Sequence, residues 1–435
     1  MRYVFGFMCV CALGVMPLVG CSETTLGPML CEGVECDDGN VCTGDACNPA
    51  TGACEYTPLA DGTACDESNE CTTGMCADGE CDTTPVLDGT VCGNGAGTCQ
   101  LGICSNVACT EQGIRDAIAA GGGPYTFDCV GPQTVVTEAE IVIDNDVVLD
   151  GEGNLTVDGD EDHRVFLVEE GVVAGLRGLT VTKGGWVEPR AVDESGGGIE
   201  NRGTLSLANC SVTQCSVPSS VNPMGGWGTG AGISNPGTLT MTNCTVSGNS
   251  AEEPGGGIFN GGTAWMTNST VSGNTPGAIL NVHEGTMAIT NSTVSANGDL
   301  AIAKIGGPGT LTLANSLIDG HCDVSDPDIA IMSDGYNIES PGNTCGFDQA
   351  TDQPAKTTAE LNLGPLTDNG GPTMTHALLT DPVVSVAIDQ IPEAECLDAD
   401  GAPLTTDQRG LARPVAIVGT EPTCDVGSFE LEVAP

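Results

Sequence analysis

Gly237-Thr-Leu-Thr-Met-Thr-Asn243 is one of five similar segments that decide the fold of this 435-residue chain. Inside it, small or polar residues alternate with apolar ones, and a period of two predicts a β-strand. Val246, nine places after the glycine, belongs to a second predicted strand. The other four segments share this pattern and run over residues 203–209, 262–268, 285–291 and 309–315.

The five segments begin 34, 25, 23 and 24 residues apart. A unit of two or three short strands in about 20–30 residues cannot bury its own apolar face, so the copies must stack on one another. Turns such as Gly248-Asn249 and Gly273-Asn274 permit the left-handed backbone that a sharp corner needs. The repeat therefore predicts an all-β solenoid.

An asparagine closes each of the five segments, and these asparagines fall in register along a solenoid. Stacked rungs lie about 4.8 Å apart, a spacing at which side-chain amides can bond to one another or to turn backbone. We therefore predict a structural asparagine ladder formed by Asn209, Asn243, Asn268, Asn291 and Asn315.

A second motif, Gly-Gly-Gly-Ile-x-Asn, occurs at residues 196–201 and 255–260, with a variant at residues 230–235. It resembles a motif of the right-handed parallel β-helices of pectate-lyase-like and polymorphic outer-membrane surface proteins. The resemblance implies that the fold is a right-handed parallel β-helix, which we expect over residues 107–350.

The chain is strongly acidic, with 59 acidic and 11 basic residues and a formal charge of −48. Such a surface repels nucleic acid and anionic lipid, and it disfavours charge pairing with a polyanionic sugar. The 24 cysteines indicate an oxidising compartment, so we expect export.

Residues 1–20 have one early cation, Arg2, followed by a short apolar run, which is typical of a signal peptide. The run ends in Leu18-Val19-Gly20-Cys21, which resembles a bacterial lipobox. The resemblance implies lipidation of Cys21 and anchoring to a membrane, with Ser22 pointing to the outer membrane or cell surface.

Residues 21–106 form a cysteine-rich region of repeated spacing and few apolar residues. Disulfides are expected to hold it, because Cys-x-x-Cys pairs and nearby histidines, the usual zinc ligands, are absent. Asp37, Asp38 and Asp45 can be read either as calcium ligands or as turn-forming residues.

A short helix is expected at the start of the solenoid, with Thr110 as its cap, Ile114, Ala117 and Ile118 as its apolar stripe, and Gly121 at its end. It would cover the open first rung. A Cys109–Cys129 bridge would pin this helix, although Cys109 can instead complete the third cysteine-rich unit. Further disulfide candidates are Cys322 with Cys345, and Cys396 and Cys424.

Two sets of residues suggest catalysis or metal binding. Asp158, Asp160 and Asp162, followed by His163 and Arg164, are candidate calcium ligands; the alternative is a polar turn between strands. A lyase base could be supplied by Lys183, Arg190, Arg202 or Lys304, but their scattered positions favour isolated surface charges. We therefore assign no catalytic residue, and calcium is the one cofactor considered.

Cys210 and Cys244 occupy equivalent places on neighbouring rungs, where serines stand further on at 269, 292 and 316. These two thiols can either bridge or stack, and the serines favour a column of small residues.

Residues 351–435 carry spaced motifs such as Asp368-Asn-Gly-Gly-Pro-Thr373 and Cys424-Asp-Val-Gly-Ser-Phe-Glu430. These are similar to the C-terminal region of the choice-of-anchor Q domain, a bacterial surface module that follows a β-helix. We expect this region to cap the solenoid. Arg409 and Arg413 are expected to form ion pairs there with nearby carboxylates, namely those of Asp389, Asp407 and Asp425.

These features together predict a non-enzymatic, lipid-anchored surface rod for adhesion or binding of a glycan, matrix or cell partner. The alternative is a carbohydrate-active enzyme, a polysaccharide lyase or glycoside hydrolase of the pectate-lyase-like type. An enzyme would gather two or more carboxylates and a base on one face of the solenoid.

Overall fold

The computed structural model describes residues 36, 40–49, 51, 53–65, 71–86, 90–92, 97–100, 103–185, 195–217, 229–252, 254–298, 300–324, 330–399, 401–415 and 422–432. The chain divides into two compact units, residues 1–65 with 74–82, and residues 66–73 with 83–435. None of the helices in the described residues is long and apolar enough to cross a membrane.

The first unit is built on disulfides. β1 (Thr43–Cys47) pairs antiparallel with β2 (Cys54–Pro58), and β3 (Ala64–Cys65), β4 (Thr72–Ala77) and β5 (Glu80–Pro85) form a three-stranded sheet. Its small buried cluster consists of Cys42, Cys65 and Cys76. The bridges Cys36–Cys54, Cys42–Cys76 and Cys65–Cys81 therefore stand in for an aliphatic core.

Beyond residue 86, the second unit continues with β6 (Val91–Cys92), β7 (Gly97–Gln100) and β8 (Ile103–Ala108), each of which pairs antiparallel with the next. β8 then pairs parallel with β9 (Gly122–Asp128). Between them lies α1 (Glu111–Ala120), where the Thr110 side chain accepts a hydrogen bond from the Gly113 N–H at 3.1 Å. Ile114, Ala117 and Ile118 are buried in the solenoid core.

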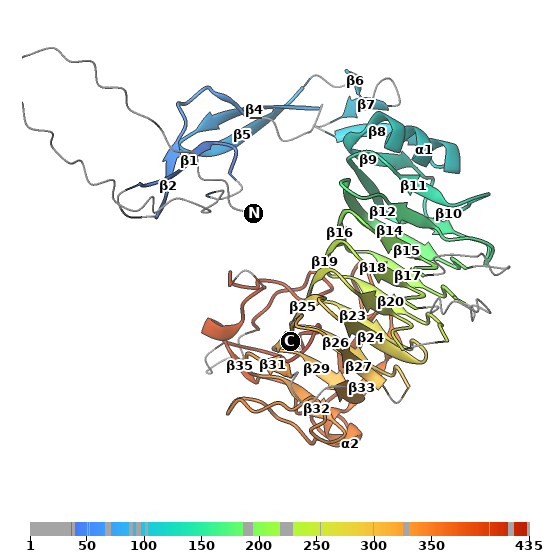
Figure 1. Ribbon diagram of the computed structural model, residues 1–435, viewed down its shortest axis with the longest axis vertical. Coiled ribbons are helices and arrows are strands. Elements are labelled where there is room, and N and C mark those ends of the chain that lie inside the picture. Colours follow the sequence, from blue (N-terminus) through green and yellow to red (C-terminus); the bar gives the residue numbers. More distant parts are fainter. Residues whose placement is uncertain are drawn as a thin grey trace, which may run out of the picture. The chain divides into compact units, whose positions relative to one another are not determined.

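The solenoid has three faces of stacked parallel strands (Figure 1). The first two faces share the long strands β12 (Val147–Asp158) and β14 (Val173–Thr182), which bend at a register shift. The first face continues with β16 (Thr204–Ala208), β19 (Thr238–Thr242), β22 (Thr263–Thr267), β25 (Thr286–Thr290), β28 (Leu311–Ala314) and β31 (Ile331–Ser333).

The second face starts at β10 (Gln133–Val136) and, after β12 and β14, continues with β17 (Ser211–Thr213), β20 (Thr245–Ser247), β23 (Thr270–Ser272), β26 (Thr293–Ser295), β29 (Leu317–Asp319) and β32 (Ile338–Ser340). The third face consists of β11 (Ile141–Ile143), β13 (Phe166–Val168), β15 (Ile199–Asn201), β18 (Ile233–Asn235), β21 (Ile258–Asn260), β24 (Gly277–Val282), β27 (Leu300–Ile305) and β30 (His321–Val324).

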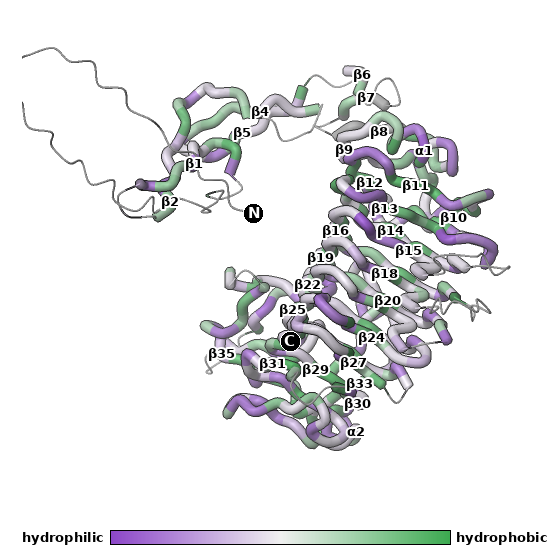
Figure 2. Tube along the Cα trace, viewed as in Figure 1, coloured by the Kyte–Doolittle hydropathy of each residue, from purple (hydrophilic) through white to green (hydrophobic). Residues whose placement is uncertain are grey.

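The alternation seen in the sequence sorts side chains between core and surface. In β19, Leu239 and Met241 are buried, whereas Thr240 points outward and is exposed. Figure 2 shows the resulting interleaving of hydrophobic and hydrophilic positions along the rungs. The parallel strand pairing confirms the predicted fold class, an all-β solenoid of stacked parallel strands.

Buried amide ladders run along the solenoid. On the third face Asn201 donates to Asn235, Asn235 to Asn260 and Asn260 to Asn281, each at 2.7 Å. Lys304 follows Asn281 in register, and its buried ammonium donates to the carbonyls of His283 and Gly306. A second ladder joins Asn249, Asn274 and Asn297 through hydrogen bonds of 2.9 Å between their side-chain amides. Both ladders satisfy polar groups that burial would otherwise leave unpaired.

The C-terminal region packs along the outside of the later rungs. It contains α2 (Thr358–Leu361), the antiparallel pair β33 (Leu363–Thr367) and β34 (Thr375–Leu378), a short 3₁₀ helix η2 (Glu393–Glu395), and the antiparallel pair β35 (Ile391–Pro392) and β36 (Thr423–Cys424). Its apolar cluster includes Leu361, Leu378 and Phe429, together with Leu317 and Ile338 of the second face.

Candidate functional site

A groove lies on the outer side of the first face, where the C-terminal region forms a wall beside the strands. The outward positions Thr240, Trp265, Ala288, Thr312 and Met332 stand directly beside one another on consecutive rungs. Trp265 is 41% exposed in this row of mostly small residues. It therefore offers a broad apolar surface above the sheet.

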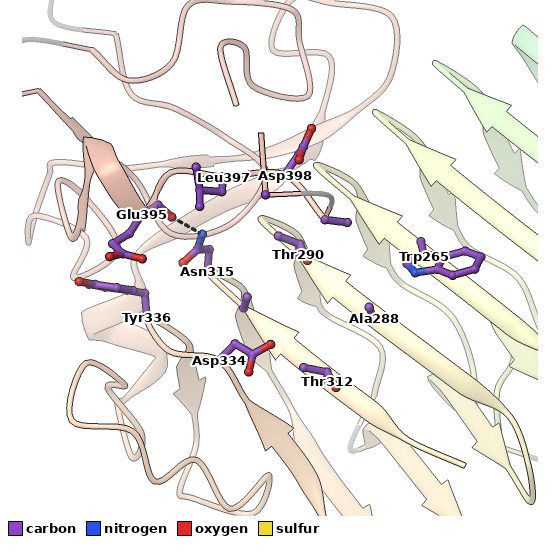
Figure 3. A pocket seen from close by; sticks show the side chains of 13 residues that line it. Trp265, Ala288, Thr290, Thr312, Asn315, Asp334, Tyr336, Glu395, Leu397 and Asp398 are labelled. Carbon is purple, nitrogen blue, oxygen red and sulfur yellow. Dashed lines mark hydrogen bonds between the residues drawn. The ribbon is translucent and has the colours of Figure 1, made fainter. Parts of the chain in front are cut away.

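The groove has a volume of about 310 Å³. Its floor comes from β22, β25 and β28, and its wall from Glu395, residues 397–399 and Gly401. Figure 3 shows Trp265 at one end of the lining, with Tyr336 and Glu395 at the other and Thr290 and Thr312 between them. The lining is Trp265, Ala288, Thr290, Thr312, Ala314, Asn315, Asp334, Tyr336, Glu395, Leu397, Asp398, Ala399 and Gly401.

Several polar groups of the lining are available to a ligand. Within the described part of the chain, the Asp334 and Glu395 carboxylates are exposed and take part in no hydrogen bond or ion pair. Asp398 accepts a bond of 2.8 Å from the Ala402 N–H, so part of its capacity is used. None of the described lining residues is basic.

The predicted asparagine column holds the wall of this groove. Asn291 and Asn315 donate from their side chains to the carbonyls of Leu397 and Glu395, at 2.6 and 3.0 Å. Asn268 donates to the Thr406 carbonyl at 3.1 Å and to the Asn243 side chain at 2.8 Å. Within this column, an amide-to-amide hydrogen bond of the expected kind joins Asn243 and Asn268. The side chains of Asn291 and Asn315 bind the C-terminal region instead.

All five asparagines of the column adopt the left-handed turn conformation, with φ between 48° and 55°. This conformation is the local reason for asparagine at these positions, since its short polar side chain tolerates it. Asn209, by contrast, is exposed.

Gln408 anchors the C-terminal region to the second face. Its amide donates to the Cys244 carbonyl at 3.1 Å and to the Thr245 hydroxyl at 2.9 Å, and its oxygen accepts from Thr270 at 2.6 Å. His376 bonds to Ser272 at 2.9 Å, and burial lowers the pKa of this imidazole. The outward Thr and Ser residues of the repeat thus serve as docking points.

Buried ion pairs tie the end of the chain together. Arg409 pairs with Asp407 at 2.7 Å and lies 3.8 Å above the Phe429 ring, and Arg413 pairs with Glu430 at 3.4 Å. Asp407 is among the partners expected from the sequence, whereas the Glu430 partner was missed. Asp425 instead accepts the backbone N–H groups of Asp389 and Leu431, at 2.7 and 2.6 Å.

Two carboxyl groups near Arg413, those of Glu430 and Asp425, have raised pKa values. Burial, assisted by the Asp425 charge, raises the pKa of Glu430 to about 7. Burial raises the pKa of Asp425 to about 6. Both carboxyl groups are therefore protonated more readily than exposed acids.

The candidate calcium ligands do not form a shared site in the described structure. Asp158 is buried, pairs with the Lys183 ammonium at 2.6 Å, and accepts the Asp160 N–H at 2.9 Å. Among the described residues, the groups of three side chains placed to share a metal ion consist of cysteines alone: Cys42, Cys65 and Cys81, and Cys71, Cys92 and Cys99. Each of these groups contains a disulfide, so neither presents three thiolates.

The described candidates for a lyase base bind other groups of the chain. Asp158 raises the pKa of Lys183 by a hydrogen bond and by its charge. Arg202 donates to Glu200 at 2.7 Å, and Lys304 is buried. Arg190 lies outside the described residues, as do Cys21, the proposed signal peptide, Asp37 and Asp38. Asp45 lies in β1.

A second hollow of about 410 Å³ lies on the third face, lined by Glu170, Ser195, Glu200, Arg202, Ser234, Pro236 and Phe259. Two of its charged groups, Glu200 and Arg202, bind each other, and Glu200 also pairs with Arg164, which pairs with Glu140 at 2.6 Å. This network leaves less free binding capacity than the groove beside Trp265.

Cysteine pairing within the second unit is local. Cys71 bridges Cys99, Cys109 bridges Cys129, Cys322 bridges Cys345, and Cys396 bridges Cys424. The last of these ties the wall of the groove, beside Glu395 and Leu397, to β36.

Three described cysteines, Cys210, Cys215 and Cys244, are free and buried. The Cys210 N–H points to the Cys244 sulfur at 3.5 Å, and the Cys244 N–H to the Ser269 hydroxyl at 3.0 Å. The Cys210 and Cys244 thiols therefore stack in a column that serines continue, and they do not bridge.

Residues 35–59 match the family described as the Dictyostelium (slime mold) repeat. No curated protein matches the sequence. Among solved structures, the crystal structure of pectate lyase Pel9A is similar at 14% identity with a TM-score of 0.39, over 73% of this chain and 90% of that chain. The strand pairing itself defines the chain as a parallel β-solenoid protein with a disulfide-rich N-terminal region.

Proposed function

We propose that this chain is an exported, non-enzymatic surface protein whose solenoid binds a glycan in the groove beside Trp265. The observation that carries the proposal is the exposed indole standing over a floor of small and hydroxyl-bearing side chains. Aromatic faces bind the apolar faces of sugar rings, while nearby hydroxyls and carboxylates bind their hydroxyl groups.

The charged side chains that line the groove favour glycan binding over lyase chemistry. Cleavage of a uronate by elimination needs a base and a cation near the sugar carboxylate. The groove offers Asp334, Glu395 and Asp398 and no described basic side chain. Lys183 and Arg202, the described lyase-base candidates that are half-buried, are held by carboxylates outside the groove.

The proposal also includes export of the chain and its attachment to a membrane. The disulfides of both units are compatible with an oxidising compartment. A lipid on Cys21 would attach the mature chain to the outer membrane or cell surface. Mass spectrometry of the N-terminal peptide tests this part, since an unmodified Cys21 in the mature protein of the native host would contradict it.

A glycan array followed by calorimetry tests the binding function. Trp265→Ala should weaken binding of any ligand found by about tenfold or more, as expected for the loss of an aromatic platform. Met332→Ala is the matched control, because Met332 is 43% exposed in the same row but does not line the groove. Equal loss in both variants, or release of unsaturated sugars from a polyuronate, would refute this role.

A further inference from the structure

All charged side chains that the structure describes in the groove are carboxylates. Asp334 and Glu395 present free carboxylates, and the Asp398 carboxylate, which accepts a hydrogen bond from the Ala402 N–H, adds a further negative charge. The whole chain carries a formal charge of −48, so the field at the groove is negative as well. An anionic sugar is therefore repelled, and a cationic ligand is attracted.

The aromatic residues at the two ends of the groove suit the same kind of ligand. Trp265 and Tyr336 both line it, and an indole or phenol face attracts a cation as well as the C–H groups of a sugar ring. Carboxylates beside an aromatic face can bind an ammonium group that carries three N–H donors.

The floor of the groove argues against an extended peptide as the occupant. β25 is hydrogen-bonded to β22 on one side and to β28 on the other, and β28 continues to β31. No free strand edge is offered by these floor strands, so a peptide cannot add to the sheet through its backbone. The hydroxyl-bearing side chains of Thr290 and Thr312 line the groove and instead match a ligand rich in hydroxyl groups.

We infer that the groove selects a cationic glycan, one built from hexosamine units with free, protonated amines, over its N-acetylated and uronate counterparts. The inference rests on the proposed glycan-binding function and names the class of sugar. The Asp334 and Glu395 carboxylates bind the ammonium groups, and Trp265 stacks on a ring.

The test is calorimetry on the full chain at pH 6 and physiological salt with three trisaccharides: triglucosamine, tri-N-acetylglucosamine and trigalacturonate. Triglucosamine should bind at least about tenfold more tightly than its acetylated form, because one charge-assisted hydrogen bond contributes about this factor. Trigalacturonate should not bind. Trp265→Ala and the double variant Asp334→Asn/Glu395→Gln should each remove the preference.

Asp323→Asn is the matched control for charge, because Asp323 is an exposed acid of β30 on the third face. It should leave the preference intact. Loss of the preference in this variant would show that the diffuse charge of the chain attracts the amine, and would overturn the inference.

The remaining outcomes separate the inference from the proposed function. Trp265-dependent binding of the acetylated trisaccharide with equal or higher affinity would overturn the inference and leave the glycan-binding function standing. Trp265-dependent binding of trilysine as tight as that of triglucosamine would also overturn the inference. If no sugar binds, on the array or in calorimetry, both the inference and the proposed glycan-binding function are overturned.

Discussion

Asn291 donates a hydrogen bond of 2.6 Å from its side-chain amide to the backbone carbonyl of Leu397, 106 residues further along the chain. Asn291 closes a repeat segment of the solenoid, and Leu397 belongs to the wall of the groove. A turn residue of the repeat thus positions the surface on which the proposed binding function depends.

Replacing Asn291 with glycine should detach this part of the wall. Asn291→Gly keeps the left-handed turn, whose φ is 48°, but removes the amide. Asn209→Gly makes the same backbone change where the side chain is exposed. We expect Asn291→Gly to be less stable than Asn209→Gly by about 1–2 kcal/mol in urea unfolding. Equal stability of the two variants would contradict the assigned contact.

The third-face ladder should be a major source of stability. Asn260 accepts from Asn235 and donates to Asn281, both at 2.7 Å and fully buried. Asn260→Ala leaves these partners unpaired, so a loss of about 2–5 kcal/mol is expected in thermal or urea unfolding. Asn145→Ala, at an exposed site, should change stability by less than about 0.5 kcal/mol. A loss at Asn260 as small as that would argue against the ladder.

Stability of the C-terminal region should fall as the pH rises from about 4 to about 7. The pKa of Glu430 is about 7 in the folded chain against an ordinary 4.5, because of burial and the Asp425 charge. The folded chain therefore holds a proton that the unfolded chain has lost in this window, and this contribution disappears as the pH passes 7.

Glu430→Gln mimics the protonated acid and should flatten the pH dependence. Relative to wild type, the variant should gain about 1–3 kcal/mol between pH 4 and pH 8, as judged by urea unfolding at a series of pH values. Glu138→Gln, which changes an exposed acid on the early rungs, should parallel the wild type. Parallel curves for Glu430→Gln and wild type would exclude a raised pKa at this carboxyl.

The Cys396–Cys424 disulfide should matter for the groove as well as for stability. Removing it by Cys396→Ala/Cys424→Ala should cost about 2–4 kcal/mol and weaken ligand binding, because Cys396 lies between wall residues Glu395 and Leu397. Cys109→Ala/Cys129→Ala breaks a bridge at the opposite end of the solenoid. That variant should lose stability and keep its ligand affinity in calorimetry, and a similar affinity loss in both would argue against a local role of the wall.

The sequence alone determined the solenoid, because each of its features repeats at short range. Alternation within segments such as Gly237–Asn243 specifies which side chains enter the core, and the spacing between segments specifies one rung. The left-handed turn at each closing asparagine follows from the same local pattern.

The partners of those asparagines were decided only by the tertiary structure. Asn268 and Asn291 reach residues more than 100 positions away, in a C-terminal region that has no repeat to reveal its register. The same long-range packing creates the groove beside Trp265, whose tryptophan stands in the sequence as one outward residue among threonines. Periodicity specifies what each rung presents to solvent, whereas contacts between distant segments depend on three-dimensional packing that no local pattern encodes.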